Sequence, residues 1–247
     1  GTGTTTFNAV TDTNAAGGIS LTGNAQTVNA NLTTTNAGPV TFTNAGLLTL
    51  NANVVSDGAV TQNGAGAVTI TGSRTVSTTS DAVDFLRAVT LNGAGTTVAI
   101  NTTAAGTGGN ITFQDTLNAT TAGATAEDLT LTAGTTGDIT FTGAVGQGTR
   151  LGDVTIASAN NATVSAAFSA ATLTQTAGTG TTTFNAVTDT NAAGGLSLTG
   201  TNLALNNTLT TTGGGSVTVN QSGTHVRLGR SHDSRPRTPG SCRSANR

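Results

Sequence analysis

The sequence predicts an all-β protein, specifically a right-handed parallel β-helix, or β-solenoid, with coils of roughly 20 residues and little or no helix. Two observations lead to this prediction. A long stretch of the chain returns almost unchanged at a fixed offset, which is the signature of a repeat architecture. Within it, a short strand core of alternating apolar and hydroxyl residues recurs along most of the chain.

The long repeat has an offset of 177 residues. Residues 1–23 read GTGTTTFNAVTDTNAAGGISLTG, and residues 178–200 differ only in having Leu196 in the place of Ile19. The match then weakens without a gap as far as Val217-Thr218, which repeat Val40-Thr41. We therefore assign residues 1–220 to one solenoid segment whose second copy starts at 178, and we interpret the chain as a slice of a longer tandem array.

The strand core is an aliphatic residue, then Thr or Ser, then an aliphatic or aromatic residue. This alternation is typical of half-buried strands, and Gly, Asn or Asp precedes most of the cores, where the chain must turn. The cores are 19–21, 40–42, 68–70, 89–91, 111–113, 129–131, 139–141, 154–156, 196–198 and 217–219. Many follow one another at about 18 to 22 residues, the size of one coil. The spacing over 129–156 is irregular, and residues 80–88 fit either a turn of helix or strands.

A solenoid explains how such a chain buries a core. No short segment carries much apolar bulk, so a coil is stabilised only by stacking on its neighbours, each buried Val, Leu or Phe contributing about 1.5–3 kcal/mol. The competing fold is an immunoglobulin-like sandwich, also built from short Thr-rich strands. Such a sandwich usually has a buried Trp or Tyr, and this chain has neither.

The composition changes abruptly near residue 221. Only 8% of all residues are charged, yet residues 221–247 hold six of the nine Arg, both His and the single Cys, with Pro236 and Pro239. We interpret 221–247 as an Arg- and Pro-rich tail, either disordered or the product of a shifted reading frame. A basic nucleic-acid-binding tail and a metal cluster of His225, His232 and Cys242 are the alternatives, but the spacing of these three residues matches no known metal-ligand pattern.

Residues 1–220 give no motif for catalysis. Glycan-cleaving β-helices need clustered carboxylates, whereas the acids here are scattered, with Glu127-Asp128 the only adjacent pair. They are Asp12, Asp57, Asp81, Asp84, Asp115, Glu127, Asp128, Asp138, Asp153 and Asp189. Asp128, Asp138 and Asp153 each precede a strand core and are interpreted as turn residues. We therefore expect no catalytic, cofactor-binding or metal-binding residues, no cofactor, and no enzymatic activity.

Several strand cores carry two hydroxyls that point to the same side. The pairs are Thr41/Thr43, Thr69/Thr71, Thr130/Thr132 and Thr140/Thr142. Alternate residues of a strand lie roughly 6.5–7 Å apart, so stacked pairs would form a Thr lattice of the kind that binds ice. The simpler interpretation is that Thr is the favoured polar residue on an exposed strand.

The segments GDITFTG (137–143), LGDVTI (151–156), ATLTQTAGTGTTTFN (171–185) and GGLSLTG (194–200) resemble the repeat regions of giant bacterial surface adhesins. These are the filamentous-haemagglutinin-like and autotransporter-type proteins, and the resemblance covers about residues 1–220. It implies a parallel β-helix shaft that is exported and displayed at the bacterial cell surface, outside the cell.

The sequence thus predicts a non-catalytic structural and adhesive shaft segment. Its expected partners are the neighbouring repeats of the same polypeptide and host or cell-surface glycans or proteins, with no nucleic acid and no membrane-spanning segment. A glycan-acting or glycan-binding β-helix is the first alternative, and an ice-binding Thr-rich solenoid is the second.

Overall fold

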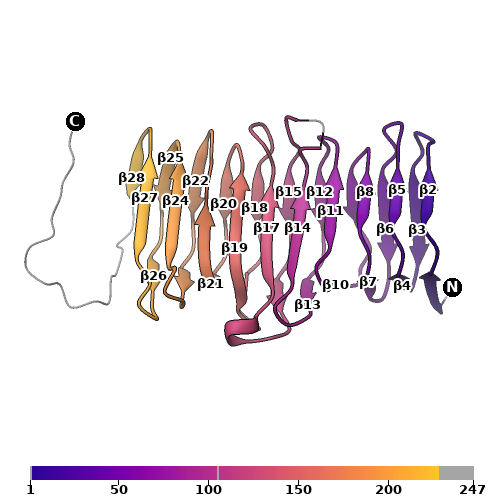
Figure 1. Ribbon diagram of the computed structural model, residues 1–247, viewed down its shortest axis with the longest axis horizontal. Coiled ribbons are helices and arrows are strands. Elements are labelled where there is room, and N and C mark those ends of the chain that lie inside the picture. Colours follow the sequence, from indigo (N-terminus) through magenta and orange to yellow (C-terminus); the bar gives the residue numbers. More distant parts are fainter. Residues whose placement is uncertain (1, 105, 228–247) are drawn as a thin grey trace, which may run out of the picture.

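The chain winds into a rod of stacked coils in the computed structural model, which describes residues 2–104 and 106–227 (Figure 1). All pairings between the strands of this part are parallel. A sandwich would pair its strands antiparallel, so the immunoglobulin-like alternative is wrong and the β-solenoid is confirmed.

Each coil crosses three faces of the rod. The first face begins with strands that pair in the order β1-β4-β7-β10-β13-β16. They are β1 (Thr4–Phe7), β4 (Ala25–Val28), β7 (Leu48–Leu50), β10 (Val68–Thr71), β13 (Val89–Asn92) and β16 (Leu117–Ala119). The same line then continues from Leu117 through Val145 to Phe168 at the start of β21, and on to β23 (Thr188–Thr190) and β26 (Leu209–Thr211).

The second face follows the first in every coil. Its strands are β2 (Thr11–Thr13), β5 (Leu32–Thr34), β8 (Val54–Ser56), β11 (Thr75–Thr78), β14 (Thr97–Asn101), β17 (Asp128–Thr132), β19 (Leu151–Ser158), β21 (Phe168–Gln175), β24 (Leu196–Gly200) and β27 (Val217–Gln221). β21 is long enough to serve two faces: its first residues pair with β23 and its last with β24.

The third face closes the coil. Its strands are β3 (Ile19–Gly23), β6 (Val40–Asn44), β9 (Val60–Gln62), β12 (Val83–Phe85), β15 (Ile111–Phe113), β18 (Ile139–Phe141), β20 (Ala162–Val164), β22 (Thr181–Phe184), β25 (Asn202–Leu205) and β28 (His225–Arg227). β28 pairs with β25 inside the segment assigned from sequence to the tail. Residues 228–247 of that tail lie outside the described residues.

Coil length is regular except in the middle of the rod. Thr4 pairs with Ala25 and Leu48 with Val68, 21 and 20 positions further on. Leu117, in contrast, lies 28 positions from both of its partners, Val89 and Val145. The added residues form longer connections at 102–110 and 120–127, and the second contains a short 3₁₀ helix, η1 (Gly123–Thr125). The segment 80–88 holds a strand, β12, and no helix.

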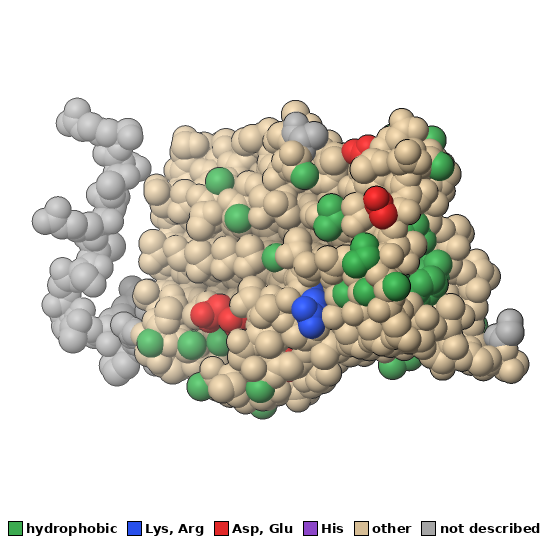
Figure 2. All heavy atoms as spheres, turned by 45° about the vertical axis from the view of Figure 1, so that its right-hand side comes forward, with side chains coloured by type: hydrophobic (Ala, Val, Ile, Leu, Met, Phe, Trp, Pro, Cys, Tyr) green, Lys and Arg blue, Asp and Glu red, His purple; other side chains and the backbone are tan. Residues whose placement is uncertain are grey.

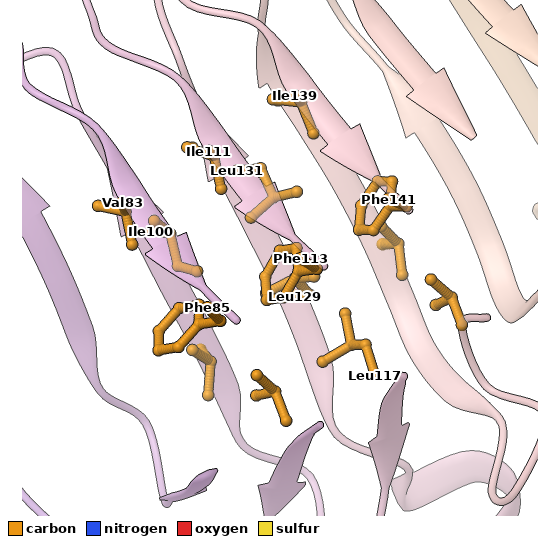
Figure 3. Packing of buried hydrophobic residues seen from close by; sticks show 14 of the residues in the cluster. Val83, Phe85, Ile100, Ile111, Phe113, Leu117, Leu129, Leu131, Ile139 and Phe141 are labelled. Atoms are coloured by element: carbon orange, nitrogen blue, oxygen red, sulfur yellow. The ribbon is translucent and has the colours of Figure 1, made fainter. Parts of the chain in front are cut away.

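One apolar core runs along the rod from Ile19 to Leu209. On the third face it contains a stack of phenylalanines, with ring centroids 5.6 Å apart for Phe85 and Phe113 and 5.5 Å for Phe113 and Phe141 (Figure 3). Phe168, from the first face, meets Phe141 edge-on. Parallel register places identical positions above one another, so each coil completes the core of the next.

Polar residues also occupy interior positions, at the corner where the second face ends. The hydroxyls of Thr34 and Ser56, whose oxygens lie 3.1 Å apart, both donate to the backbone carbonyl of Gly38. Two coils further on, Thr102 donates to the carbonyl of Gly109 at 2.8 Å. The Gly38 carbonyl also accepts the backbone N–H of Gly58, so these hydroxyls satisfy their own hydrogen-bonding needs inside the corner on carbonyls of the turning chain.

Candidate interaction surface

The surface of the rod consists mainly of hydroxyl, amide and backbone groups, with few charged side chains on the side shown in Figure 2. On the first face, strand register aligns one outward threonine per coil. The row reads Thr6, Thr27, Thr49, Thr69 and Thr90, and ends at Asn118. Because neighbouring parallel strands lie about 4.8 Å apart, this row is a regular ladder of hydroxyl groups.

A second row on this face carries amides. The side-chain nitrogen of Asn29 donates to the oxygen of Asn8 at 2.8 Å, and that of Asn51 donates to the oxygen of Asn29 at 2.8 Å. Asn29 both donates and accepts along the axis of the rod, so the row connects three successive coils. Ladders of Asn between coils are expected from the sequence, although these particular residues were not singled out; the signal is an Asn two positions after each of these three outward threonines.

The other two faces carry similar but less regular rows. On the third face the outward row is Ser20, Thr41, Thr61, Asp84, Thr112, Thr140, Thr163 and Thr183. On the second face Thr130 is followed by Thr155, Thr174, Ser197 and Thr218, while the exposed Val55 interrupts the hydroxyls nearer the N-terminus. Three of the four predicted threonine pairs lie on the outward side of one strand, whereas Thr142 of the fourth pair follows the end of β18 at Phe141.

The scattered acids stay scattered, with one exception. Asp128 and Asp153 occupy neighbouring coils of the second face, and an oxygen of Asp128 accepts the backbone N–H of Asp153 at 2.6 Å. An oxygen of Asp153 in turn accepts the hydroxyl of Thr172 at 2.7 Å. Asp153 lies within β19 and Asp128 is the first residue of β17, which corrects the interpretation of both as turn residues. Both carboxylates are used to connect coils, and neither is buried.

Asp138 has the turn role that the sequence predicted. It lies between β17 and β18, and one of its oxygens accepts the backbone N–H of Asn161 at 2.9 Å and the side-chain amide of Asn160 at 3.0 Å. Its own N–H donates to Asn110 in the previous coil at 2.9 Å. Asp138 therefore joins three coils at one corner, through its backbone N–H on one side and its carboxylate on the other.

Glu127 has a structural role that sequence reasoning missed. It is fully buried, the only buried acid among the described residues. Its carboxylate accepts the backbone N–H groups of Gly93 (2.9 Å), Thr120 (3.1 Å) and Thr121 (3.0 Å), and the hydroxyls of Thr120 (2.6 Å) and Thr121 (3.0 Å). The side chain thus fastens the long 120–127 connection to the preceding coil. The available signal was that Glu127 is the only Glu in the chain and lies beside the irregular spacing.

Burial and hydrogen bonding act in opposite directions on this carboxylate. Burial alone would raise the pKa of Glu127, but the hydrogen bonds from Thr120 and Thr121 outweigh it. The pKa of Glu127 is therefore lowered from its usual 4.5. The group is held as a structural anion.

The only ion pair among the described residues joins Arg150 to Asp189, which lies two coils further on. The guanidinium also donates to the backbone carbonyls of Ala170 and Asp189, both at 3.0 Å. Arg150 consequently connects three successive coils at the edge of the first face.

Comparisons with protein-family models, with curated proteins and with solved structures find no match to this chain. Within residues 2–104 and 106–227, no three His, Cys, Asp or Glu side chains come together in a way that could hold a metal ion. No helix of this described part is long and apolar enough to cross a membrane.

Proposed function

We propose that this chain is a shaft segment of an exported bacterial surface protein, with a structural and adhesive role and no catalytic one. The observation that carries the proposal is the continuity of the rod. One core extends from Ile19 to Leu209, and parallel backbone pairing continues from β1 to β28 without a domain boundary. Such a body transmits force and sets a distance, as a spacer requires.

The side chains support the same role. The Asn ladder, Asp138, Glu127 and Arg150 each join one coil to the next and so stiffen the rod along its axis. The outward hydroxyl and amide groups repeat in every coil, so a weak contact made by one coil can be made again by its neighbours. Repetition of this kind raises avidity by roughly 10²- to 10⁴-fold without any new contact.

Surface display can be tested directly on cells that carry the gene. An antibody raised against purified protein should label intact, unpermeabilised cells, and external protease should remove the label while an internal marker protein survives. Labelling that occurs only after the cells are permeabilised would rule out display and with it the proposed function.

The threonine row of the first face favours a second candidate, ice binding. Five outward threonines in consecutive coils, from Thr6 to Thr90, form a straight hydroxyl array of the kind that could match an ice surface. Ice binding predicts thermal hysteresis that is lost in the double variant Thr49→Lys/Thr69→Lys. The shaft predicts no hysteresis in the wild type or in the variant.

A further inference from the structure

The two copies of the long repeat do not occupy the same faces of the rod. Six consecutive strands of the first copy, β1 to β6, coincide in their bounds with β22 to β27 at the offset of 177 residues. Yet β1 lies on the first face and β22 on the third, next to β20 and β25. β2 lies on the second face, whereas its counterpart β23 continues the line of the first.

The count of coils gives the size of this shift. Along the third face, Ser20 is separated from Thr183 by seven coil steps. Starting from β1, the chain completes seven coils, crosses the first and second faces once more in β21, and then enters β22 on the third face. One repeat is therefore seven and two-thirds turns long, one third of a turn short of eight.

Local structure is preserved while the face changes. Gly18 and Gly195 both have a φ of 61°, and a Cβ at either would collide with the backbone of the next coil, at Pro39 and Ser216 respectively. Phe7 and Phe184 both point inward, although they line different faces. The repeated sequence thus specifies the same six strands and their corners in both copies, but not the face of the rod on which each strand lies.

The two long coils are the physical source of the shift. A unit of 177 residues built only from 20- to 22-residue coils would exceed eight turns, whereas two 28-residue coils absorb the excess in the 102–110 and 120–127 connections. Glu127 anchors the second connection by accepting bonds from Gly93 and Thr120. The part of the repeat between the two matched segments therefore sets the rotation.

We propose that each copy of this repeat turns its surface through one third of a revolution, so that a tandem array presents the same features on all three faces in succession. Three copies would complete 23 turns and restore the starting face. The surface residues that change face include Thr6, Asn8, Val10 and Asp12. Their equivalents in the second copy are Thr183, Asn185, Val187 and Asp189.

This inference rests on the proposed shaft function, and it specifies how the shaft meets its surroundings. Val10 and Val187 are both exposed, at 69% and 45%, so the same apolar and polar groups are displayed in two directions. Such an array suits a partner that encloses the rod, such as a meshwork of polymer chains, and makes many weak contacts around its circumference. The array does not suit a flat partner surface, because the next copy displays the same residues on a face that points away from that surface.

The rotation can be tested with pairs of spin labels on the full chain, in a Cys242→Ser background. Ser20→Cys with Thr183→Cys places both labels on the third face, seven coil steps or roughly 34 Å apart along the axis. Thr6→Cys with Thr183→Cys joins equivalent positions of the two copies on different faces. Pulsed dipolar measurements should give a clearly longer distance for the second pair.

If the repeat were a whole number of turns, Thr6 and Thr183 would lie on the same face and Ser20 would lie on a different face from Thr183. The Thr6/Thr183 distance would then not exceed the Ser20/Thr183 distance, and that result would overturn the proposal. Thr41→Cys and Thr27→Cys, each paired with Thr183→Cys, repeat the comparison one coil nearer in case a terminal variant fails to fold. Neither outcome depends on surface display, so the rotation and the shaft function can fail independently.

Discussion

The two copies of the repeated segment have nearly the same sequence but very different burial. In the first copy, at the N-terminal edge of the rod, the strand TTTF is largely exposed, whereas in the second its Thr182 and Phe184 are buried between β20 and β25. At the other edge the order is reversed. Val40 of the first copy is 0% exposed, and Val217 of the second is 41% exposed. In this fold, the burial of a strand depends on whether a coil is stacked on each side of it and not on its own sequence. Stability must therefore be cooperative along the axis.

The largest predicted effect compares the same phenylalanine in both settings. Phe184→Ala removes a fully buried ring and should cost about 3–5 kcal/mol in the free energy of unfolding. Phe7→Ala removes a partly buried ring at the edge and should cost much less, because fewer neighbours lose contacts. Urea unfolding followed by circular dichroism measures both variants, and equal costs would contradict the dependence on stacking.

The long coils between the copies provide the second prediction. Glu127→Gln replaces one of the two accepting oxygens with an NH2 group that cannot accept, so buried N–H or hydroxyl donors on that side lose their acceptor, and the variant should cost about 2–3 kcal/mol at neutral pH. Because the folded pKa lies below 4.5, the stability contributed by the carboxylate is fully present above that pH and is lost as the pH falls through the lowered value. The difference in the free energy of unfolding between the wild type and Glu127→Gln should therefore shrink as the pH falls.

Unfolding curves of both proteins at several pH values between 7 and 3 test this. A constant difference between the wild type and Glu127→Gln across that range would show that the carboxylate does not titrate as proposed. Asp84→Asn, on the outward side of β12, is the matched control for loss of a charge at the surface.

The strands were predictable from the sequence because their inward residues are strongly apolar. All ten predicted cores lie in strands, from Ile19 in β3 to Val217 in β27. Three other strands, β8, β9 and β11, were missed because they place Ser56, Gln62 and Thr78 inward, where hydrogen bonds inside the corners compensate for burying a polar group. The parallel stacking also followed from the sequence.

The face that each strand occupies did not follow from the sequence. The cores at 40–42 and 68–70 look alike, yet the first is on the third face and the second on the first face. Every face alternates buried and outward residues in the same way, so the pattern has no information on orientation. The spacing between strands does not identify the face either, because the long connections at 102–110 and 120–127 change the length of a coil without changing its strands.

A smaller effect is expected from the aspartate that has a partner in only one copy. Asp189 pairs with Arg150, and both side chains remain about a quarter exposed, at 26% and 27%. Asp189→Asn should therefore cost less than about 1 kcal/mol, and the cost should shrink further in high salt. Its counterpart Asp12 is exposed and belongs to no ion pair of the described residues, so Asp12→Asn should be neutral within error. Equal effects of the two variants would argue against a contribution from the ion pair.

The smallest effect should be the same in both copies. Asn8 accepts a hydrogen bond from Asn29 at 2.8 Å, and Asn185 accepts one from Asn206 at 2.7 Å, and both pairs lie on the exposed side of the coil. Because this contact needs only the next coil and no core, we expect Asn8→Ala and Asn185→Ala to cost about 0.5 kcal/mol each. Thermal unfolding of the two variants side by side would show whether the costs agree. A clearly larger cost for Asn185→Ala would mean that even the surface ladders depend on stacking from both sides, and that the edge coil is weaker than its hydrogen bonds indicate.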